Sequence, residues 1–231
     1  MPADLQSIAD PRLILLAWGA GLSLVGAVIA WRRIVGPGFT WLVAGVAALV
    51  ALAGALADGA WWARGGMVLL GVSALGGRRP SWAAGALGLA GTGFLVEAAL
   101  FGGVIPAATA TLALGGVTGE MMLGHWYLID PRLPRGALRN LAAAGIGGLV
   151  AEAILHFSLR IGVSGGGAVG FWTLLVASVV LMAAVIGALR YPAYSGVMAA
   201  TGLSYLALLT TLGAVFVGRA LAAGLGPFDL G

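Results

Sequence analysis

Long apolar segments follow one another along the whole chain, with only short polar stretches between them. A bilayer core of about 30 Å needs about 20 mainly apolar residues per helix, and eight segments approach that requirement. The eight segments are Leu13–Trp31, Phe39–Leu56, Trp61–Leu75, Trp82–Phe101, Ile105–Leu128, Leu141–Leu159, Phe171–Leu189 and Met198–Val217. The pattern predicts an all-α integral membrane protein, a polytopic bundle of about eight transmembrane helices that forms one domain over residues 1–231. The third segment is short and contains Arg64; if it is re-entrant, seven spans remain.

The composition strengthens this prediction. Hydrophobic residues make up 61% of the chain and charged residues 9%, whereas about a quarter of the residues in soluble domains are charged. The chain also contains 40 glycines. Small residues let transmembrane helices approach closely, so we interpret the runs Gly85–Gly93 and Gly145–Gly148 as packing faces. A codon bias toward glycine, alanine and arginine is the competing explanation.

The arginines predict an orientation, because short cytoplasmic loops are enriched in positive charge. One predicted side receives eight of them: Arg32, Arg33, Arg78, Arg79, Arg132, Arg135, Arg139 and Arg190. The other side receives four: Arg12, Arg64, Arg160 and Arg219. We therefore expect the connection Tyr127–Arg139 in the cytoplasm and both termini outside, in the inner membrane of a bacterium. The first ten residues contain Asp4 and Asp10 and no arginine or lysine, which predicts that the first apolar segment is retained and not cleaved as a signal peptide.

Several kinds of chemistry are excluded by the residue types. The chain has no cysteine, which excludes thiolate metal sites and cysteine nucleophiles. It contains no stand-alone catalytic motif and no contiguous basic face that would bind nucleic acid. We accordingly expect no catalytic residues, no metal site and no nucleic-acid partner; any role in an enzyme would be that of a non-catalytic membrane subunit.

Five ionisable residues fall within the predicted spans. They are Glu97, Glu120, His125, Glu152 and His156. A charge at the centre of a bilayer costs about 2.5–3.5 kcal/mol on insertion scales, and such residues commonly mark proton or ion routes. We predict a proton pathway through four of them, Glu97, Glu120, Glu152 and His156. The alternative is that each is a neutral or hydrogen-bonded packing residue.

The spacing of these residues indicates two Glu-His pairs. Glu152 and His156 are four residues apart, share one helix face and can hydrogen-bond. Glu120 and His125 are five apart, which separates them by about 140° on a regular helix; a π-bulge at Gly124 would restore a shared face. The two histidines are expected at opposite membrane faces, about 25 Å apart, which disfavours a haem ligated by both.

A cofactor site is predicted where the fifth segment ends in polar and aromatic residues. His125 and Tyr127 are suited to bind quinone carbonyls, with Trp126 stacking on the ring and Glu120 carrying protons. Haem b, with one histidine and a methionine as ligands, is the weaker alternative. The arginines that follow are predicted to contact lipid phosphate: Arg132, Arg135 and Arg139. Simple anchoring of the helix at the membrane interface would explain the same residues.

One internal similarity and three functions follow from these observations. The segment GGVTGEMMLGHWYL (Gly115–Leu128) aligns with GGLVAEAILHFSL (Gly147–Leu159) after one gap, as in an inverted repeat.

The leading hypothesis is a membrane subunit of an electron-transfer or energy-conserving complex, with a quinone pocket and other subunits as partners. The first alternative is a proton-coupled small-solute transporter or ion channel. The second is a structural scaffold.

Overall fold

The computed structural model describes residues 10–57, 59–76, 79–130, 133–159 and 165–223. Within these residues the chain is entirely helical and contains no strand. The eight helices are α2 (Pro11–Trp31), α3 (Pro37–Ala55), α4 (Trp61–Leu75), α5 (Pro80–Gly102), α6 (Val104–Ile129), α7 (Arg135–Ser158), α8 (Gly166–Arg190) and α9 (Tyr194–Ala222). Each predicted segment corresponds to one helix. The third, short segment is α4, with the predicted bounds.

Local sequence signals explain where several helices begin. Proline occupies the first helical position of α2, α3 and α5 (Pro11, Pro37 and Pro80), where its fixed φ suits a helix and its missing N–H is not needed. Asp10 caps α2, because its Oδ1 accepts a hydrogen bond from the N–H of Arg12. These prolines lie a few residues before the apolar segments. The helices α2, α3 and α5 therefore begin earlier than hydropathy alone predicts.

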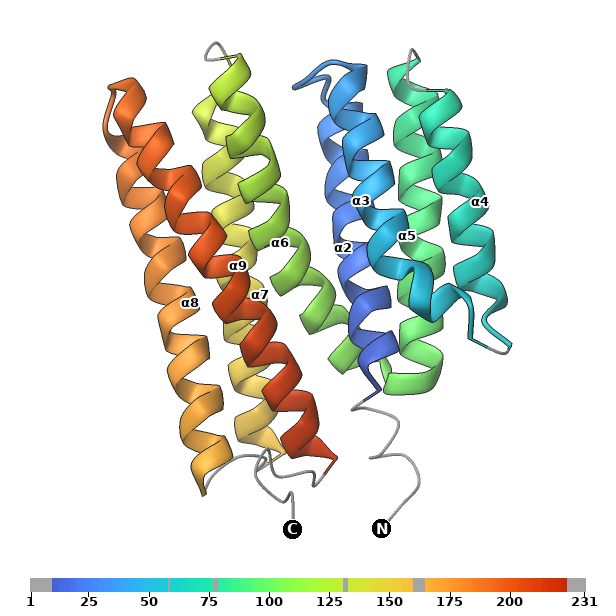
Figure 1. Ribbon diagram of the computed structural model, residues 1–231, viewed down its shortest axis with the longest axis vertical. Coiled ribbons are helices and arrows are strands. Elements are labelled where there is room, and N and C mark those ends of the chain that lie inside the picture. Colours follow the sequence, from blue (N-terminus) through green and yellow to red (C-terminus); the bar gives the residue numbers. More distant parts are fainter. Residues whose placement is uncertain (1–9, 58, 77–78, 131–132, 160–164, 224–231) are drawn as a thin grey trace.

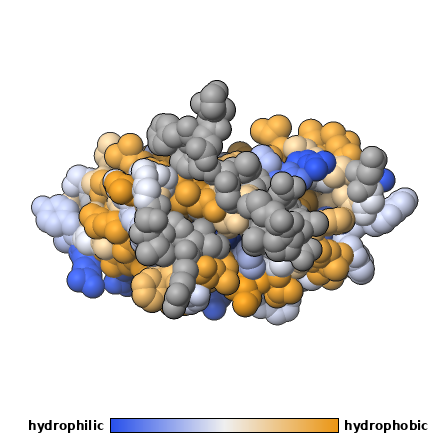
Figure 2. All heavy atoms as spheres, turned by 90° about the horizontal axis from the view of Figure 1, so that it is seen from below, coloured by the Kyte–Doolittle hydropathy of each residue, from blue (hydrophilic) through white to orange (hydrophobic). Residues whose placement is uncertain are grey.

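Six of the eight helices are long and apolar enough to cross a membrane, which is consistent with a helical membrane protein. The remaining two are α4, which has only 15 residues, and α6, which contains Glu120, three threonines and four glycines among its 26 residues. Large hydrophobic side chains are exposed on the described helices, and the view from below shows hydrophobic patches interspersed with hydrophilic residues (Figure 2). Such an exposed apolar surface suits lipid and not water.

The helices form two four-helix bundles that lie side by side (Figure 1). In the first bundle, α2–α5, each helix packs against its neighbours in sequence and α2 closes the ring against α5. The second bundle, α6–α9, repeats this arrangement, with α6 closing against α9. The bundles meet chiefly through α2 and α6, the first helix of each. The repeat of the fold is therefore between halves of four helices, whereas the sequence similarity described above relates the consecutive helices α6 and α7.

Glycine permits the close crossing of α2 and α6. A Cβ added to Gly21 would lie 2.6 Å from the Cα of Gly115, and one added to Gly115 would lie 2.5 Å from the Cα of Gly21. The contact is reciprocal, since each glycine lies where a side chain on the other would have to fit. Trp18 adds a hydrogen bond across the same interface, from Nε1 to Oγ1 of Thr118 at 2.8 Å.

The predicted glycine faces are confirmed in part. Gly91 and Gly93 pack tightly against α2 and α4, whereas Gly85 faces open space. Gly145 and Gly148 pack closely against α6, but Gly147 on the same helix meets nothing within 4 Å. About half of the glycines in these runs therefore have a packing role.

Candidate functional site

A buried polar cluster joins three helices of the second bundle, near the start of α6 and the ends of α7 and α9. It consists of Thr109 on α6, Glu152 and His156 on α7, and Arg219 on α9, and we call it the Glu152 cluster. All four side chains are at least nine-tenths buried. Apolar residues surround them, so the charged side chains of the cluster are shielded from solvent inside the bundle.

Glu152 is the centre of the cluster. Its Oε1 accepts hydrogen bonds from Nη2 of Arg219 at 2.7 Å and from Oγ1 of Thr109 at 2.6 Å. Nη2 of Arg219 also donates to the carbonyl of Pro106 at 2.8 Å, which ties α9 to the start of α6. The second oxygen, Oε2, has no hydrogen-bond partner among the described residues. The ion pair with Arg219 therefore involves one carboxylate oxygen, and the other makes no hydrogen bond to the described residues.

His156 lies next to that second oxygen. Its Nδ1 is 3.7 Å from Oε2 of Glu152 and 2.9 Å from the backbone oxygen of the same residue. The shared helix face is therefore confirmed, but the closest contact is with the backbone and not with the carboxylate. The ring packs on Phe171 with centroids 4.2 Å apart, and Nε2 has no partner among the described residues. A Cβ on Gly218 would lie 2.6 Å from Nε2, so only glycine leaves room for the ring.

Arg219 is the charged member of the cluster that the sequence analysis did not predict. The prediction placed it in a loop beyond Val217, and this is wrong because α9 continues to Ala222 and buries the side chain. A signal was present in the spacing of polar residues on α9: Thr201, Ser204 and Thr211 are buried on the face that points into the bundle, and Arg219 extends this stripe two turns further. A polar stripe at helical spacing predicts that the helix and its buried face continue.

Glu120 lies in the other half of α6, apart from the Glu152 cluster. It is fully buried, and neither carboxylate oxygen accepts a hydrogen bond from the described residues in this geometry. Gly124 leaves space beside it for Thr201, whose Oγ1 would lie 2.8 Å from a Cβ added there. The two buried carboxylates, Glu120 and Glu152, lie toward opposite ends of the second bundle, because each is in the second half of its helix and α6 and α7 run in opposite directions.

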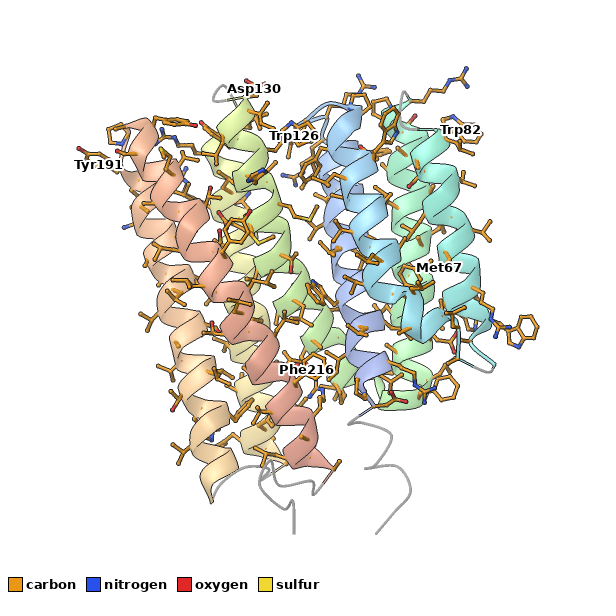
Figure 3. The ribbon with its side chains drawn as sticks, in the orientation of Figure 1. Met67, Trp82, Trp126, Asp130, Tyr191 and Phe216 are labelled. Atoms are coloured by element: carbon orange, nitrogen blue, oxygen red, sulfur yellow. The ribbon has the colours of Figure 1, made fainter. Side chains whose placement is uncertain are left out.

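The predicted cofactor residues point in different directions. Helix α6 is a regular α-helix through Gly124, so the suggested π-bulge is wrong and Glu120 and His125 lie on different faces. His125 is exposed and its Nδ1 is 3.5 Å from the hydroxyl of Tyr205 on α9. Tyr127 is buried in the core, while Trp126 packs edge-on against Phe39 of α3. Figure 3 shows Trp126 between the two bundles.

The predicted lipid-contacting arginines also differ from one another. Arg135 donates hydrogen bonds to the carbonyls of Tyr191, Pro192 and Ala193, and so fastens the start of α7 to the turn between α8 and α9. Arg139 is exposed at the same end. Arg132 lies outside the described residues, as do Arg78 and Arg160 of the predicted topology. Arg135 therefore has a structural role that its sequence position did not indicate.

Glu97 on α5 is the buried carboxylate of the first bundle. It is 2% exposed, and its Oε2 accepts the N–H of Ala63 at 3.1 Å. That N–H belongs to the first turn of α4, which has no side-chain cap of its own, so Glu97 supplies the missing acceptor from a neighbouring helix. Glu97 also borders a cavity of about 290 Å³. No group of three or more His, Cys, Asp or Glu side chains within the described residues is placed to hold a metal ion.

Comparisons with known proteins add nothing to this geometry: no protein-family model, no curated protein and no solved structure matches the chain.

Proposed function

We propose that the protein is a proton-coupled transporter of the bacterial inner membrane, built from two four-helix halves, and that Glu152 is the residue whose protonation drives it. The observation that carries the proposal is the ion pair between Glu152 and Arg219, which are 2.7 Å apart and at most 4% exposed. Ionisable residues buried in a membrane bundle are costly and commonly belong to proton or substrate routes.

The Glu152 cluster can couple proton binding to a change in the arrangement of α7 and α9. Protonation of Glu152 removes the negative partner of Arg219 and leaves a buried, unpaired charge, which is strongly unfavourable. The packing of α7 and α9 around the pair then becomes less stable, so the two protonation states favour different arrangements of these helices. His156, 3.7 Å from Oε2, is placed to exchange a proton with the carboxyl group.

The architecture supports movement of one half against the other. The bundles share the same ring of four helices and meet mainly along α2 and α6, at the reciprocal contact of Gly21 and Gly115. Many transporters are built from repeats that rock about such an interface while a site between or within them changes its exposure. A helix pair without side chains at its crossing point is suited to act as the pivot.

Transport assays in proteoliposomes test the proposal. The purified full chain would be reconstituted, and a pH gradient imposed while the uptake of small alkylammonium, carboxylate and neutral solutes is measured together with internal pH. We expect at least one solute to move with proton counterflow, and Glu152→Gln to lower that coupled uptake at least tenfold. Asp130→Asn, which removes the same charge at an exposed position, should stay within twofold of wild type. Unchanged uptake by Glu152→Gln would contradict the proposal.

The orientation in the membrane is part of the same proposal. We infer that all eight helices cross the bilayer, with the turn between α6 and α7 in the cytoplasm, because arginine is more abundant at that end. The natural absence of cysteine makes the test simple. Single cysteines at Asp130 and at Ala57 should react with an impermeant maleimide from the inside and the outside, respectively. Labelling of both positions from one side would reject this topology.

A second candidate is the membrane subunit of an electron-transfer complex, and the pair His125 and Tyr205 favours it. Both side chains are exposed on the outer face of α6 and α9, with Nδ1 and the hydroxyl 3.5 Å apart, so they present two hydrogen-bonding groups to a quinone in the lipid. Binding of a short-chain quinone that is lost in both His125→Ala and Tyr205→Phe would support this function. Equal quinone binding by wild type and both variants would exclude the site.

A further inference from the structure

The first bundle contains a cavity that is separate from the Glu152 cluster, and we call it the Glu97 cavity. It lies between α2, α3, the α3–α4 turn and α5, at the end of the molecule that bears Asp10. Its volume is about 290 Å³, close to the lower limit of about 300 Å³ for small-molecule sites. Polar residues Asp10, Arg12 and Glu97 line it together with apolar residues Leu13, Leu16 and Phe101.

The described residues that line the cavity carry two carboxylates, Asp10 and Glu97, and one arginine, Arg12. Asp10 and Arg12 form an ion pair, with Nη2 of Arg12 2.6 Å from Oδ2 of Asp10, so they compensate each other. Arg64, the nearby arginine of α4, donates to the carbonyls of Ala55 and Ala57 at the end of α3. Glu97 contributes one formal negative charge, and only its Oε2 accepts a hydrogen bond from the described residues.

We propose that the Glu97 cavity binds a small organic cation, an alkylammonium of a few carbons, with its ammonium group on Glu97 and its alkyl chain against Leu13, Leu16 and Phe101. A buried carboxylate favours a cation that brings both charge and hydrogen-bond donors, and an ammonium group has three donors. The apolar walls favour an alkyl chain over a hydrated metal ion, because hard cations such as calcium require six to eight oxygen ligands.

This inference rests on the proposed function and names its substrate class. The two bundles would then have different roles: the first binds the cationic solute at Glu97, and the second binds the proton at Glu152. The exchange of one ammonium ion for one proton is balanced in charge. A cation entering the first bundle would be compensated by Glu97, whereas a proton entering the second would neutralise Glu152 and leave Arg219 without its partner.

Binding measurements on the full chain in phosphatidylcholine nanodiscs test the inference, with n-butylammonium as the probe and butyrate and 1-butanol as controls. We expect wild type and Asp130→Asn to bind n-butylammonium with dissociation constants within twofold of each other. Glu97→Gln should weaken binding at least tenfold, because glutamine keeps an acceptor for the Ala63 N–H and removes only the charge. Wild type should bind butyrate and butanol at least tenfold more weakly than n-butylammonium.

Three results would overturn the inference: no binding of n-butylammonium to wild type, equal binding to Glu97→Gln, or equal binding of butyrate. If Glu97→Gln fails to fold, Ala57→Phe replaces it, since a phenyl ring at that lining position would fill the cavity. This variant should also weaken binding at least tenfold, and unchanged binding would count against the site. Glu152→Gln separates the two proposals: it should abolish coupled transport yet retain n-butylammonium binding. If Glu152→Gln keeps coupled transport, the proposed function fails. If wild type shows coupled transport but binds no n-butylammonium, only the inference about the Glu97 cavity fails.

Discussion

The two four-helix bundles share a fold but handle buried charge in opposite ways. In the second bundle Glu152 is paired with Arg219 and the cluster is closed by Thr109 and His156. In the first, Glu97 caps α4 with one oxygen and borders a cavity of about 290 Å³. The same arrangement of four helices therefore holds a buried ion pair in one half and a buried carboxylate beside a cavity in the other. The helical fold determines where a buried charged side chain can lie. The side chains around it determine whether its charge is compensated by the protein or is available to a ligand.

The largest expected effect comes from breaking the ion pair of the second bundle. Arg219→Met leaves Glu152 buried and unpaired, which we expect to lower the free energy of unfolding by about 3–5 kcal/mol. Unfolding in mixed micelles monitored by tryptophan fluorescence measures this. The double variant Arg219→Met with Glu152→Leu should recover most of the loss, because no charge then remains. Equal destabilisation of single and double variants would show that the pair is not the cause.

Glu97→Gln is the matched change in the first bundle and sharpens the comparison. It should alter the unfolding free energy far less than Arg219→Met does, because the glutamine oxygen still accepts the Ala63 N–H and no counter-charge is left behind. A loss as large as that of Arg219→Met would mean that Glu97 is also held by a charge partner.

A second large effect is expected where the bundles meet. Gly115→Ala places a methyl group 2.5 Å from the Cα of Gly21, and overpacking of this kind costs about 1–3 kcal/mol. Gly85→Ala is the control, since it meets nothing within 4 Å and should be neutral or stabilising. Thermal unfolding of both variants in nanodiscs measures the difference. If the two variants behave alike, the α2–α6 crossing is looser than described.

A smaller effect is expected from the polar contact across the same interface. Trp18→Phe removes the hydrogen bond to Thr118 while retaining an aromatic ring, and should cost about 1 kcal/mol. Thr118→Val removes the same bond from the other side. The two losses should not add in the double variant, and full additivity would argue that the hydrogen bond contributes nothing.

The smallest effect concerns Asp10, which precedes α2. The hydrogen bond from the Arg12 side chain lowers the pKa of Asp10 below its ordinary value of 3.8. The ionised carboxylate is thus favoured in the folded state, so its stabilisation is present above about pH 4 and is lost as the pH falls through the lowered pKa. More than half of the Arg12 side chain is exposed, so solvent screening should keep the contribution below about 1 kcal/mol. Unfolding of Asp10→Asn should differ from wild type above pH 4 and converge with it at lower pH.

The sequence predicted the number and order of the helices because the apolar segments, including the short third one, are separated by stretches that contain proline, arginine or glycine. It also predicted that Glu152 and His156 share a face, which follows from their spacing alone. It could not predict that Arg219 pairs with Glu152, because the two lie 67 residues apart and the pairing depends on how α9 packs against α7. The split of Glu120 from His125 depended on whether Gly124 distorts α6, and the fold keeps that helix regular.

The most direct test of the central claim is solute exchange compared with accumulation in proteoliposomes that contain Glu152→Gln. Whichever solute wild type accumulates under a pH gradient would be measured in both modes. If protonation of Glu152 supplies the coupling, the variant loses accumulation at least tenfold but still exchanges labelled for unlabelled solute when no gradient is present. Accumulation by Glu152→Gln at the wild-type level would contradict the account, since the ion pair with Arg219 would then have no part in coupling.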